Sequence, residues 1–218
     1  MDIVDPRIEE YVERLTSPHD PLLAELSAET AEELGSTSML TGPVAGRLLE
    51  LLVWVAQPTR VLEIGTFSGH SALAMAAALP RGGRIDACER DPARAAFAQR
   101  YFDHSPHGSK ITLHVGPARE TIERLEGDFD FVFIDADKQN IPDYFTWSLK
   151  LARPGSLIIV DNVVREGAVT NAKSRNPNVR GVRRFNDLLT EERSVSATTI
   201  QTVGVKGYDG FTLALVTG

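Results

Sequence analysis

Polar side chains with complementary chemistry follow two apolar stretches of the sequence. Asp135 and Lys138 come shortly after one stretch, and Asp161 and Asn162 come directly after another. In a parallel sheet both sets would lie at the carboxyl edge, where open α/β folds bind ligands. Each residue alone is better explained as an Asx-turn or a helix cap. Together, two carboxylates and an amide favour an open site for a hard divalent cation such as Mg²⁺, although this ligand set does not separate Mg²⁺ from Mn²⁺ or Ca²⁺.

A second constellation surrounds a glycine-rich loop. The apolar run Val61–Ile64 leads into Gly65 and Gly69, and an Ala- and Leu-rich helical segment follows. This order is typical of a nucleotide-binding βα unit, but Glu63 occupies the position of the first glycine in a dinucleotide fingerprint. A carboxylate there repels a pyrophosphate and can accept hydrogen bonds from an ammonium group, which favours a cationic amino-acid ligand. A second acid, Glu89, ends the next predicted strand, where it can bind the ribose hydroxyls of an adenosine.

The pattern of apolar and polar residues predicts an α/β fold that brings both constellations to one edge. Seven strands are expected, at Arg60–Ile64, Gly83–Cys88, Ile111–Val115, Phe129–Ile134, Ser156–Val160, Ala197–Val203 and Gly210–Val216. The first five alternate with helices and should be parallel. The last two are too close in sequence for a helical crossover and should form an antiparallel hairpin through residues 204–209. We therefore expect a Rossmann-like, mostly parallel seven-stranded sheet with helices on both faces.

The N-terminal residues are expected to form a helical cap. We divide the single expected domain, residues 1–218, into this cap at 1–57 and a Rossmann-like core at 58–218. The predicted cap helices are Pro6–Leu15, Pro21–Leu34 and Val44–Val55. The first carries an apolar stripe that suits a lid or a dimer face, namely Ile8, Tyr11, Val12 and Leu15. The third is expected to pack against the sheet through Leu48, Leu51, Leu52 and Val55.

Composition excludes several classes of protein. The net charge of −7 over 218 residues argues against a protein that binds nucleic acid over its whole surface. The only cysteine, Cys88, allows no disulfide within the chain, which indicates a reducing compartment. The N-terminus lacks the pattern of a signal peptide, and no apolar run approaches the length of a membrane span. We expect a cytoplasmic protein without a membrane segment.

The motifs resemble those of a known family. Glu63-x-Gly65-x-x-x-Gly69 followed by an acid at the end of the second strand resembles the class I methyltransferases, which bind S-adenosylmethionine. Phe-Ile-Asp-Ala-Asp-Lys at 133–138, together with Val-Asp-Asn-Val at 160–163, is similar to the cation-dependent O-methyltransferases, the family of catechol and caffeoyl-CoA O-methyltransferases. The resemblance extends from Thr41 to Leu215 and implies the class I methyltransferase fold and a homodimer.

The resemblance also implies roles for individual residues. Asp135, Asp161 and Asn162 would bind the metal, and Lys138 would take the proton of the acceptor hydroxyl. The residues implied for S-adenosylmethionine are Thr41, Glu63, Gly65, Thr66, Ser71, Glu89, Ala118 and Asp137. Two positions depart from the family pattern. Ala118 stands where some relatives have serine, and Glu166 replaces an asparagine that contacts substrate in plant relatives, which weakens transfer of the caffeoyl-CoA substrate.

The proposed chemistry is consistent with these residue types. A cation that chelates two adjacent acceptor oxygens lowers the pKa of the hydroxyl to be methylated. An unperturbed lysine has a pKa of about 10.4, so Lys138 needs the cation and partial burial to lower that pKa before it can act as a base. The alternative is a solvated surface lysine. The hydroxyl oxygen would then attack the sulfonium methyl in line, with alignment as the main source of acceleration.

We therefore predict a methyltransferase for a small aromatic vicinal diol, and several alternatives stay open. Basic residues that follow the fifth predicted strand are usual for a solvated loop but could contact phosphate, and some bacterial relatives resemble tRNA-modifying enzymes; these residues are Arg165, Lys173, Arg175, Arg180, Arg183 and Arg184. A tRNA-modifying O-methyltransferase is thus the first alternative. A non-catalytic α/β binding module and a nicotinamide dehydrogenase are the others. The aromatic residues Tyr144, Phe145 and Trp147 are better explained as a helix packed on the sheet than as an acceptor pocket.

Overall fold

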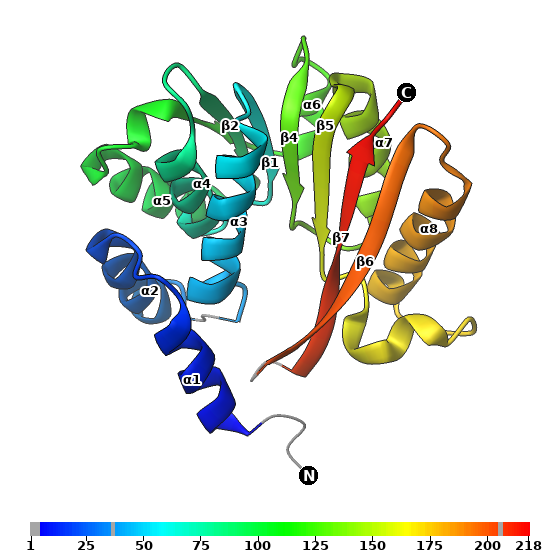
Figure 1. The fold of residues 1–218 in the computed structure, drawn as a ribbon, viewed down its shortest axis with the longest axis horizontal. Coiled ribbons are helices and arrows are strands. Elements are labelled where there is room, and N and C mark those ends of the chain that lie inside the picture. The colour runs from blue at the N-terminus through cyan, green and yellow to red at the C-terminus, as the bar shows by residue number, and fades with distance from the viewer. Residues whose placement is uncertain (1–4, 36–37, 205–206) are drawn as a thin grey trace.

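A computed structural model describes residues 5–35, 38–204 and 207–218. Its centre is a seven-stranded sheet in the order β3-β2-β1-β4-β5-β7-β6 (Figure 1). The strands are β1 Arg60–Ile64, β2 Arg84–Glu89, β3 Ile111–Val115, β4 Phe129–Ile134, β5 Ala152–Asp161, β6 Val195–Gly204 and β7 Gly207–Val216. The predicted fold class, with its mostly parallel sheet and antiparallel C-terminal hairpin, is confirmed.

The register of the sheet aligns the residues that follow its central strands. Ile64 of β1 pairs in parallel with Cys88 of β2 on one side and with Ile134 of β4 on the other. Ile134 pairs in turn with Val160 of β5. The glycine-rich loop and the segments after β4 and β5 therefore leave the sheet side by side, at the edge that sequence reasoning selected.

The C-terminal hairpin is longer than predicted. Strands β6 and β7 pair from Val195 with Val216 up to Gly204 with Gly207, so most of the turn predicted at 204–209 is strand. Residues 205 and 206 of that predicted turn lie outside the described part. In Figure 1 the long hairpin extends past the carboxyl ends of the parallel strands toward helix α1, Pro6–Leu15.

Alternate residues of each strand contact helices on opposite faces of the sheet, as the period of two along a strand requires. The helices are α1 Pro6–Leu15, α2 Pro21–Glu33, α3 Gly42–Ala56, α4 His70–Ala78, α5 Pro92–His104, α6 Ala118–Ile122, α7 Ile141–Leu151 and α8 Pro177–Glu191. Leu62 and Ile64 belong to a core shared with α6, α7 and α8, whereas Val61 belongs to a core shared with α3 and α4. Helices thus cover both faces, as predicted.

One prediction about packing is wrong in part. Helix α3 packs against the core through Leu49, Val53 and the partly buried Leu52, of which only Leu52 was predicted to do so. Leu51 and Val55, which were also expected to face the sheet, are 54% and 86% exposed. The helix is apolar on nearly all sides, so the sequence pattern does not select the buried face. The stripe on α1 is also exposed, because none of the described residues of that helix is buried.

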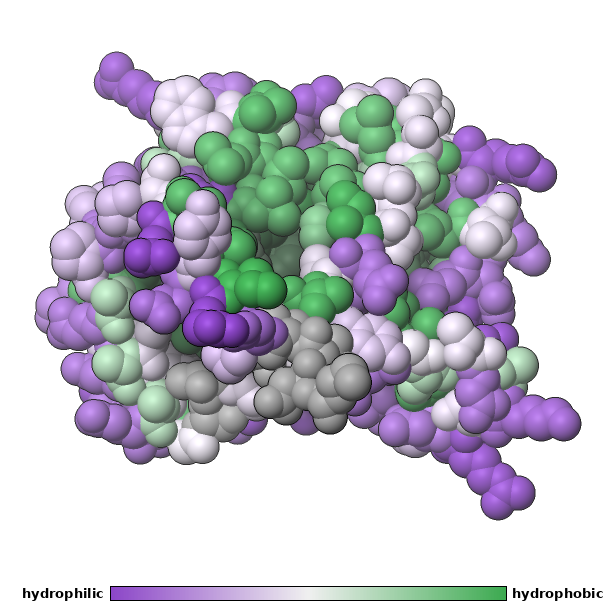
Figure 2. All heavy atoms as spheres, turned by 60° about the horizontal axis from the view of Figure 1, so that its bottom comes forward, coloured by the Kyte–Doolittle hydropathy of each residue, from purple (hydrophilic) through white to green (hydrophobic). Residues whose placement is uncertain are grey.

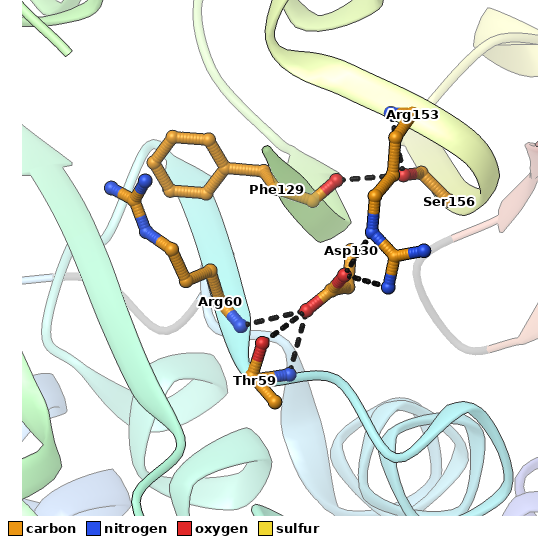
Figure 3. Close-up of polar contacts among 6 residues, drawn as sticks. All are labelled: Thr59, Arg60, Phe129, Asp130, Arg153 and Ser156. Carbon is orange, nitrogen blue, oxygen red and sulfur yellow. Dashed lines mark hydrogen bonds and ion pairs between the residues drawn. The ribbon is translucent and has the colours of Figure 1, made fainter. Parts of the chain in front are cut away.

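The amino edge of the sheet is held by one carboxylate, Asp130 of β4 (Figure 3). One of its oxygens accepts from the backbone N–H and hydroxyl of Thr59, each at 2.7 Å, and from the N–H of Arg60 at 3.0 Å. The other accepts two hydrogen bonds from the Arg153 guanidinium, at 2.9 and 2.6 Å. Asp130 therefore links β4 to β1 and β5 at the end of the sheet that lies opposite the two constellations.

Candidate active site

A cavity of about 1120 Å³ lies at the carboxyl edge of the sheet. It is lined by the loop after β1, the ends of β2, β4 and β5, the start of α3, one side of α1 and the hairpin residues 202–204 and 207–209. The face turned forward in Figure 2 is hollowed near its centre, and hydrophobic residues line much of the hollow. The site residues predicted from the sequence border this one cavity with one exception, Glu63. Glu63 is connected to the cavity through its hydrogen-bond partners Thr66 and Ser71, which do border it.

Gly65 joins the two constellations at the level of the backbone. Its φ of +99° is in the left-handed region, and a Cβ placed on it would lie 2.2 Å from the carbonyl oxygen of Asp135. The N–H of Asp135 donates to the carbonyl of Ile64 at 2.9 Å, which holds the two segments together. Only glycine fits both the conformation and the contact. The cofactor loop and the candidate metal segment therefore form one unit.

Glu63 lies at the floor of the loop and is fully buried. Its two oxygens accept hydrogen bonds from the hydroxyls of Ser71 at 2.6 Å and Thr66 at 2.8 Å. Burial raises the pKa of Glu63 to about 7, although the two hydroxyls act in the opposite direction. Ser71 and Thr66, which the resemblance implies as cofactor contacts, thus orient a carboxylate whose remaining acceptor capacity can receive an ammonium group.

Glu89 fixes the shape of the same loop from the end of β2. One oxygen accepts from the backbone N–H of Phe67 and the other from the N–H of Asp91, both at 2.8 Å. Phe67 has a φ of +51°, so this hydrogen bond stabilises an uncommon conformation in the middle of the loop. Glu89 is therefore a buried support of the loop as well as a candidate ribose ligand.

Asp135, Lys138 and Asp161 lie together where β4 and β5 end. Lys138 Nζ donates to Asp135 at 2.7 Å, and only 12% of the Lys138 side chain is exposed, so the solvated alternative does not hold. Burial, with the nearby charge of Asp135, raises the pKa of Asp161 to about 7. Asn162 follows with a φ of +61°, and its N–H donates to Asp161 at 2.7 Å.

This donor set fits a hard divalent cation. Among the described residues, no cluster of three His, Cys, Asp or Glu side chains could hold a metal ion, so a site here needs the Asn162 amide beside the two carboxylates. Two carboxylates follow the register-paired ends of β4 and β5, and the raised pKa of Asp161 reflects first its burial and then repulsion by Asp135. A cation coordinated by their oxygens would relieve it.

Comparison with known proteins decides the family. Residues 13–216 match the sequence profile of the family described as O-methyltransferase. A catechol O-methyltransferase from Niastella koreensis is 40% identical over 96% of this chain and 96% of its own length. The chain belongs to the O-methyltransferase family.

Solved structures agree with this assignment. The O-methyltransferase TomG from Streptomyces achromogenes, solved in complex with S-adenosylmethionine, is 42% identical and superposes with a TM-score of 0.92 over 97% of this chain and 96% of that one. An O-methyltransferase from Bacillus cereus, solved with S-adenosylhomocysteine, is 40% identical with a TM-score of 0.93 over 97% of each chain. The protein is therefore an S-adenosylmethionine-dependent O-methyltransferase. None of its described helices is long and apolar enough to cross a membrane.

Two aromatic residues of this O-methyltransferase border the cavity, although sequence reasoning placed them in the core. The Tyr144 hydroxyl donates to Asp137 at 2.7 Å, and Asn140 donates to the other Asp137 oxygen at 2.5 Å. Trp147 also lines the cavity, and the Arg119 guanidinium lies over its ring at 5.4 Å from the centroid. Tyr144 both packs in the core and lines the cavity. The helical spacing of these residues on α7 is the same for a residue that packs on the sheet and for one that lines the cavity, so the spacing could not tell the two roles apart.

His70, at the first position of α4, also borders the cavity of the O-methyltransferase. It is 3% exposed, and burial, with the neighbouring His19, lowers its pKa to about 4. Its Nδ1 has no hydrogen-bond partner among the residues that the structure describes. Helix α3 accommodates the ring through Gly46, where a Cβ would lie 2.9 Å from the imidazole. His70 is thus a neutral, wedged side chain between α3 and α4 at ordinary pH.

The basic residues that kept the tRNA alternative open are partly engaged within the chain. Arg165 pairs with Asp209 at 3.3 Å. Arg183 donates to the carbonyl of Val169, and Arg184 donates to that of Gln139 at 3.2 Å. These three guanidinium groups fasten the loop after β5 and helix α8, which is the structural role that a charged surface segment commonly has.

Proposed function

We propose that this enzyme methylates a hydroxyl of a small aromatic vicinal diol, of the catechol or caffeoyl type, with the help of a divalent cation. The observation that carries the proposal is the group formed by Asp135, Lys138 and Asp161. Two carboxylates and a lysine meet at one end of the cavity, directly beside the glycine-rich loop. The name of the Niastella relative agrees with a catechol acceptor.

The residues of this chain would then divide into three tasks. Glu63 accepts the ammonium group of S-adenosylmethionine, Glu89 binds its ribose, and the backbone at Gly65 approaches it closely. Asp135, Asp161 and Asn162 hold the cation, which when bound would polarise two adjacent acceptor oxygens as a Lewis acid. Thr41, at the start of α3, and the segment Ala118–Arg119 close the cofactor end of the cavity.

Lys138 is the proposed base. Its Nζ lies against Asp135, and an acceptor oxygen bound at that carboxylate would lie within reach of the amine. In its neutral form Lys138 takes the proton of the hydroxyl, the oxygen forms a bond to the methyl carbon, and the bond from that carbon to the cofactor sulfur breaks. The carboxylate of Asp135 holds the amine in place and stabilises the ammonium that results.

The test is methyl transfer from labelled S-adenosylmethionine to a panel of catechols, with Mg²⁺ and with EDTA, beside an unmodified tRNA pool. We expect turnover of catechols that EDTA abolishes, and turnover by Lys138→Ala that is lower by about 10²–10⁴. Resorcinols serve as controls because their hydroxyls cannot chelate one cation. Equal turnover with EDTA would remove the cation from the proposal, and label found only in tRNA would replace the acceptor.

We also propose that the enzyme is a cytoplasmic homodimer, with helices α1 and α3 in its interface. The apolar stripe of α1 and the outer face of α3 are exposed, including Leu15 at 69% and Trp54 at 62%. Exposed apolar patches of this kind commonly mark interaction surfaces. Light scattering after size exclusion tests the proposal: Leu15→Asp and Trp54→Asp should each shift the mass toward that of the 23.8 kDa monomer.

A further inference from the structure

The segment that carries Asn162 has an unusual backbone. Asn162, Arg165, Glu166 and Gly167 all have positive φ, of 61°, 52°, 54° and 80°. Such values are uncommon for residues other than glycine, and a run of them persists only where the surroundings fix it. The segment 162–167 forms one wall of the cavity at its acceptor end, through Asn162, Arg165 and Glu166.

One carboxylate, Asp209 of β7, holds this segment in place. Its Oδ1 accepts from the backbone N–H of Val164 at 2.9 Å and from that of Arg165 at 2.8 Å. Its Oδ2 receives the Arg165 guanidinium at 3.3 Å. Next to it, Gly210 accepts from the N–H of Val163 at 3.0 Å. Asp209 and Gly210 therefore bind three successive amides of the segment.

The neighbouring residues leave this segment little room to rearrange. A Cβ on Gly210 would lie 2.8 Å from Cγ2 of Val164, so the hairpin and the segment are in close contact there. A Cβ on Gly167 would lie 3.0 Å from the Tyr208 hydroxyl. The hairpin thus fits the left-handed segment closely, and Asp209 supplies the polar contacts of that fit.

From this geometry we propose that Asp209 is the positioning residue of the metal site. By binding the amides of Val164 and Arg165 it holds the segment in its left-handed conformation and fixes the direction of the Asn162 amide. It does not itself ligate the cation or contact the acceptor. The inference rests on the proposed function, because it requires a cation at Asp135, Asp161 and Asn162.

The experiment measures Mn²⁺ affinity, by the loss of the free-ion electron paramagnetic resonance signal, in wild type, Asp209→Ala and Asp209→Asn. We expect Asp209→Ala to weaken Mn²⁺ binding about 10–100-fold, the range seen when a supporting partner of a metal ligand is removed. Asp209→Asn keeps an oxygen that accepts both amides, so we expect binding within about threefold of wild type. Asp209→Ser, with one acceptor oxygen, should lie between them and serves if the alanine variant does not fold.

The matched control is Asp91→Ala. Asp91 also accepts two successive backbone amides, those of Ala93 at 2.8 Å and Arg94 at 3.3 Å, and also faces an arginine. It does not border the cavity, so its loss should lower the melting temperature without changing Mn²⁺ affinity. Equal Mn²⁺ affinity in Asp209→Ala and wild type would overturn the positioning role, and so would equal weakening by the alanine and asparagine variants. A wild type that binds no Mn²⁺ would instead remove the proposed metal site itself.

Discussion

Strand β4 has an aspartate near each end, and the two have opposite environments. Asp130, at the amino edge, accepts five hydrogen bonds from Thr59, Arg60 and Arg153 (Figure 3). Burial favours its protonated form, but these donors outweigh burial and hold the pKa of Asp130 below its ordinary value. Asp135, at the carboxyl edge, has Lys138 as its ionic partner in the structure and lies beside a second carboxylate, Asp161, whose pKa is raised to about 7.

The difference separates a carboxylate that stabilises the fold from the two carboxylates that we propose as metal ligands. At the amino edge every oxygen has donors from the chain, so ionisation contributes to the stability of the folded state. At the carboxyl edge the chain brings negative charges together without enough donors, which costs stability and leaves an attraction for cations. Substitutions at the two edges should therefore have opposite effects on stability and on turnover.

The largest expected effect is that of Asp161→Asn on turnover. If Asp161 is the charged metal ligand that we propose, its loss should lower kcat/KM for a catechol by about 10³-fold or more, or about 4 kcal/mol. The same change should stabilise the protein free of metal at pH 8. Because the folded pKa of Asp161, about 7, exceeds its ordinary value of 3.8, its charge costs stability increasingly as pH rises through this window.

Thermal unfolding at pH 8 and at pH 4, in EDTA, measures that stability effect. The variant should unfold at higher temperature than wild type at pH 8 and at nearly the same temperature at pH 4, where Asp161 is protonated in the folded protein. A variant that is less stable than wild type at pH 8 would contradict the view that the ionised carboxylate of Asp161 destabilises the folded protein.

The reverse pattern is expected for Asp130→Ala. It leaves the backbone amides of Thr59 and Arg60 and the guanidinium of Arg153 without their acceptor, at a cost of about 2–4 kcal/mol in the free energy of unfolding. Urea denaturation measures this loss. In the fraction that remains folded, kcat/KM should stay within about twofold of wild type, and a fall comparable to that of Asp161→Asn would show that the two edges are not independent.

A smaller effect concerns the pH dependence of cofactor binding. Burial raises the pKa of Glu63 to about 7. In the proposed function the ammonium of S-adenosylhomocysteine binds the ionised form of Glu63, so affinity should increase about tenfold from pH 6 to pH 8 and then level off. Calorimetric titration across this range tests it. Glu63→Gln should bind weakly and without this dependence, and Asp161→Asn should retain it. His70, with a pKa near 4, stays neutral throughout and cannot be its source.

Much of the fold could be predicted from the sequence, because the periodicity of apolar residues identifies the strands and helices and their order along the chain determines how the strands pair. The parallel sheet followed from strands that alternate with helices, and the antiparallel hairpin followed from two strands without a crossover. The meeting of Glu63 and Glu89 with Asp135 and Asp161 followed from the rule that carboxyl ends of parallel strands share one edge. That rule concerns strand ends, so it needs no knowledge of individual side-chain contacts.

The contacts that could not be predicted are those made across long sequence separations by residues of ordinary type. The apolar pattern of α3 does not choose between Val53 and Val55, because the helix is apolar on nearly all sides. Asp209 follows a turn-like sequence. Nothing in that sequence predicts that its carboxylate accepts hydrogen bonds from backbone amides 44 and 45 positions earlier in the chain. Asp130 likewise lies within an apolar strand, without a pattern that marks its partners.

The smallest expected effect is that of Arg153→Met on stability, which separates the two kinds of contact that Asp130 makes at the amino edge. Arg153→Met removes the ion pair of Asp130 but leaves its three hydrogen bonds from Thr59 and Arg60. The Arg153 side chain is 54% exposed, and exposed ion pairs contribute little because water screens them, so the loss should be at most about 1 kcal/mol. Urea denaturation beside Asp130→Ala measures the two contributions. If Arg153→Met lowers the free energy of unfolding as much as Asp130→Ala does, the ion pair is the main contact that stabilises this edge. The small loss that we expect would show that the hydrogen bonds from Thr59 and Arg60 are the main contact.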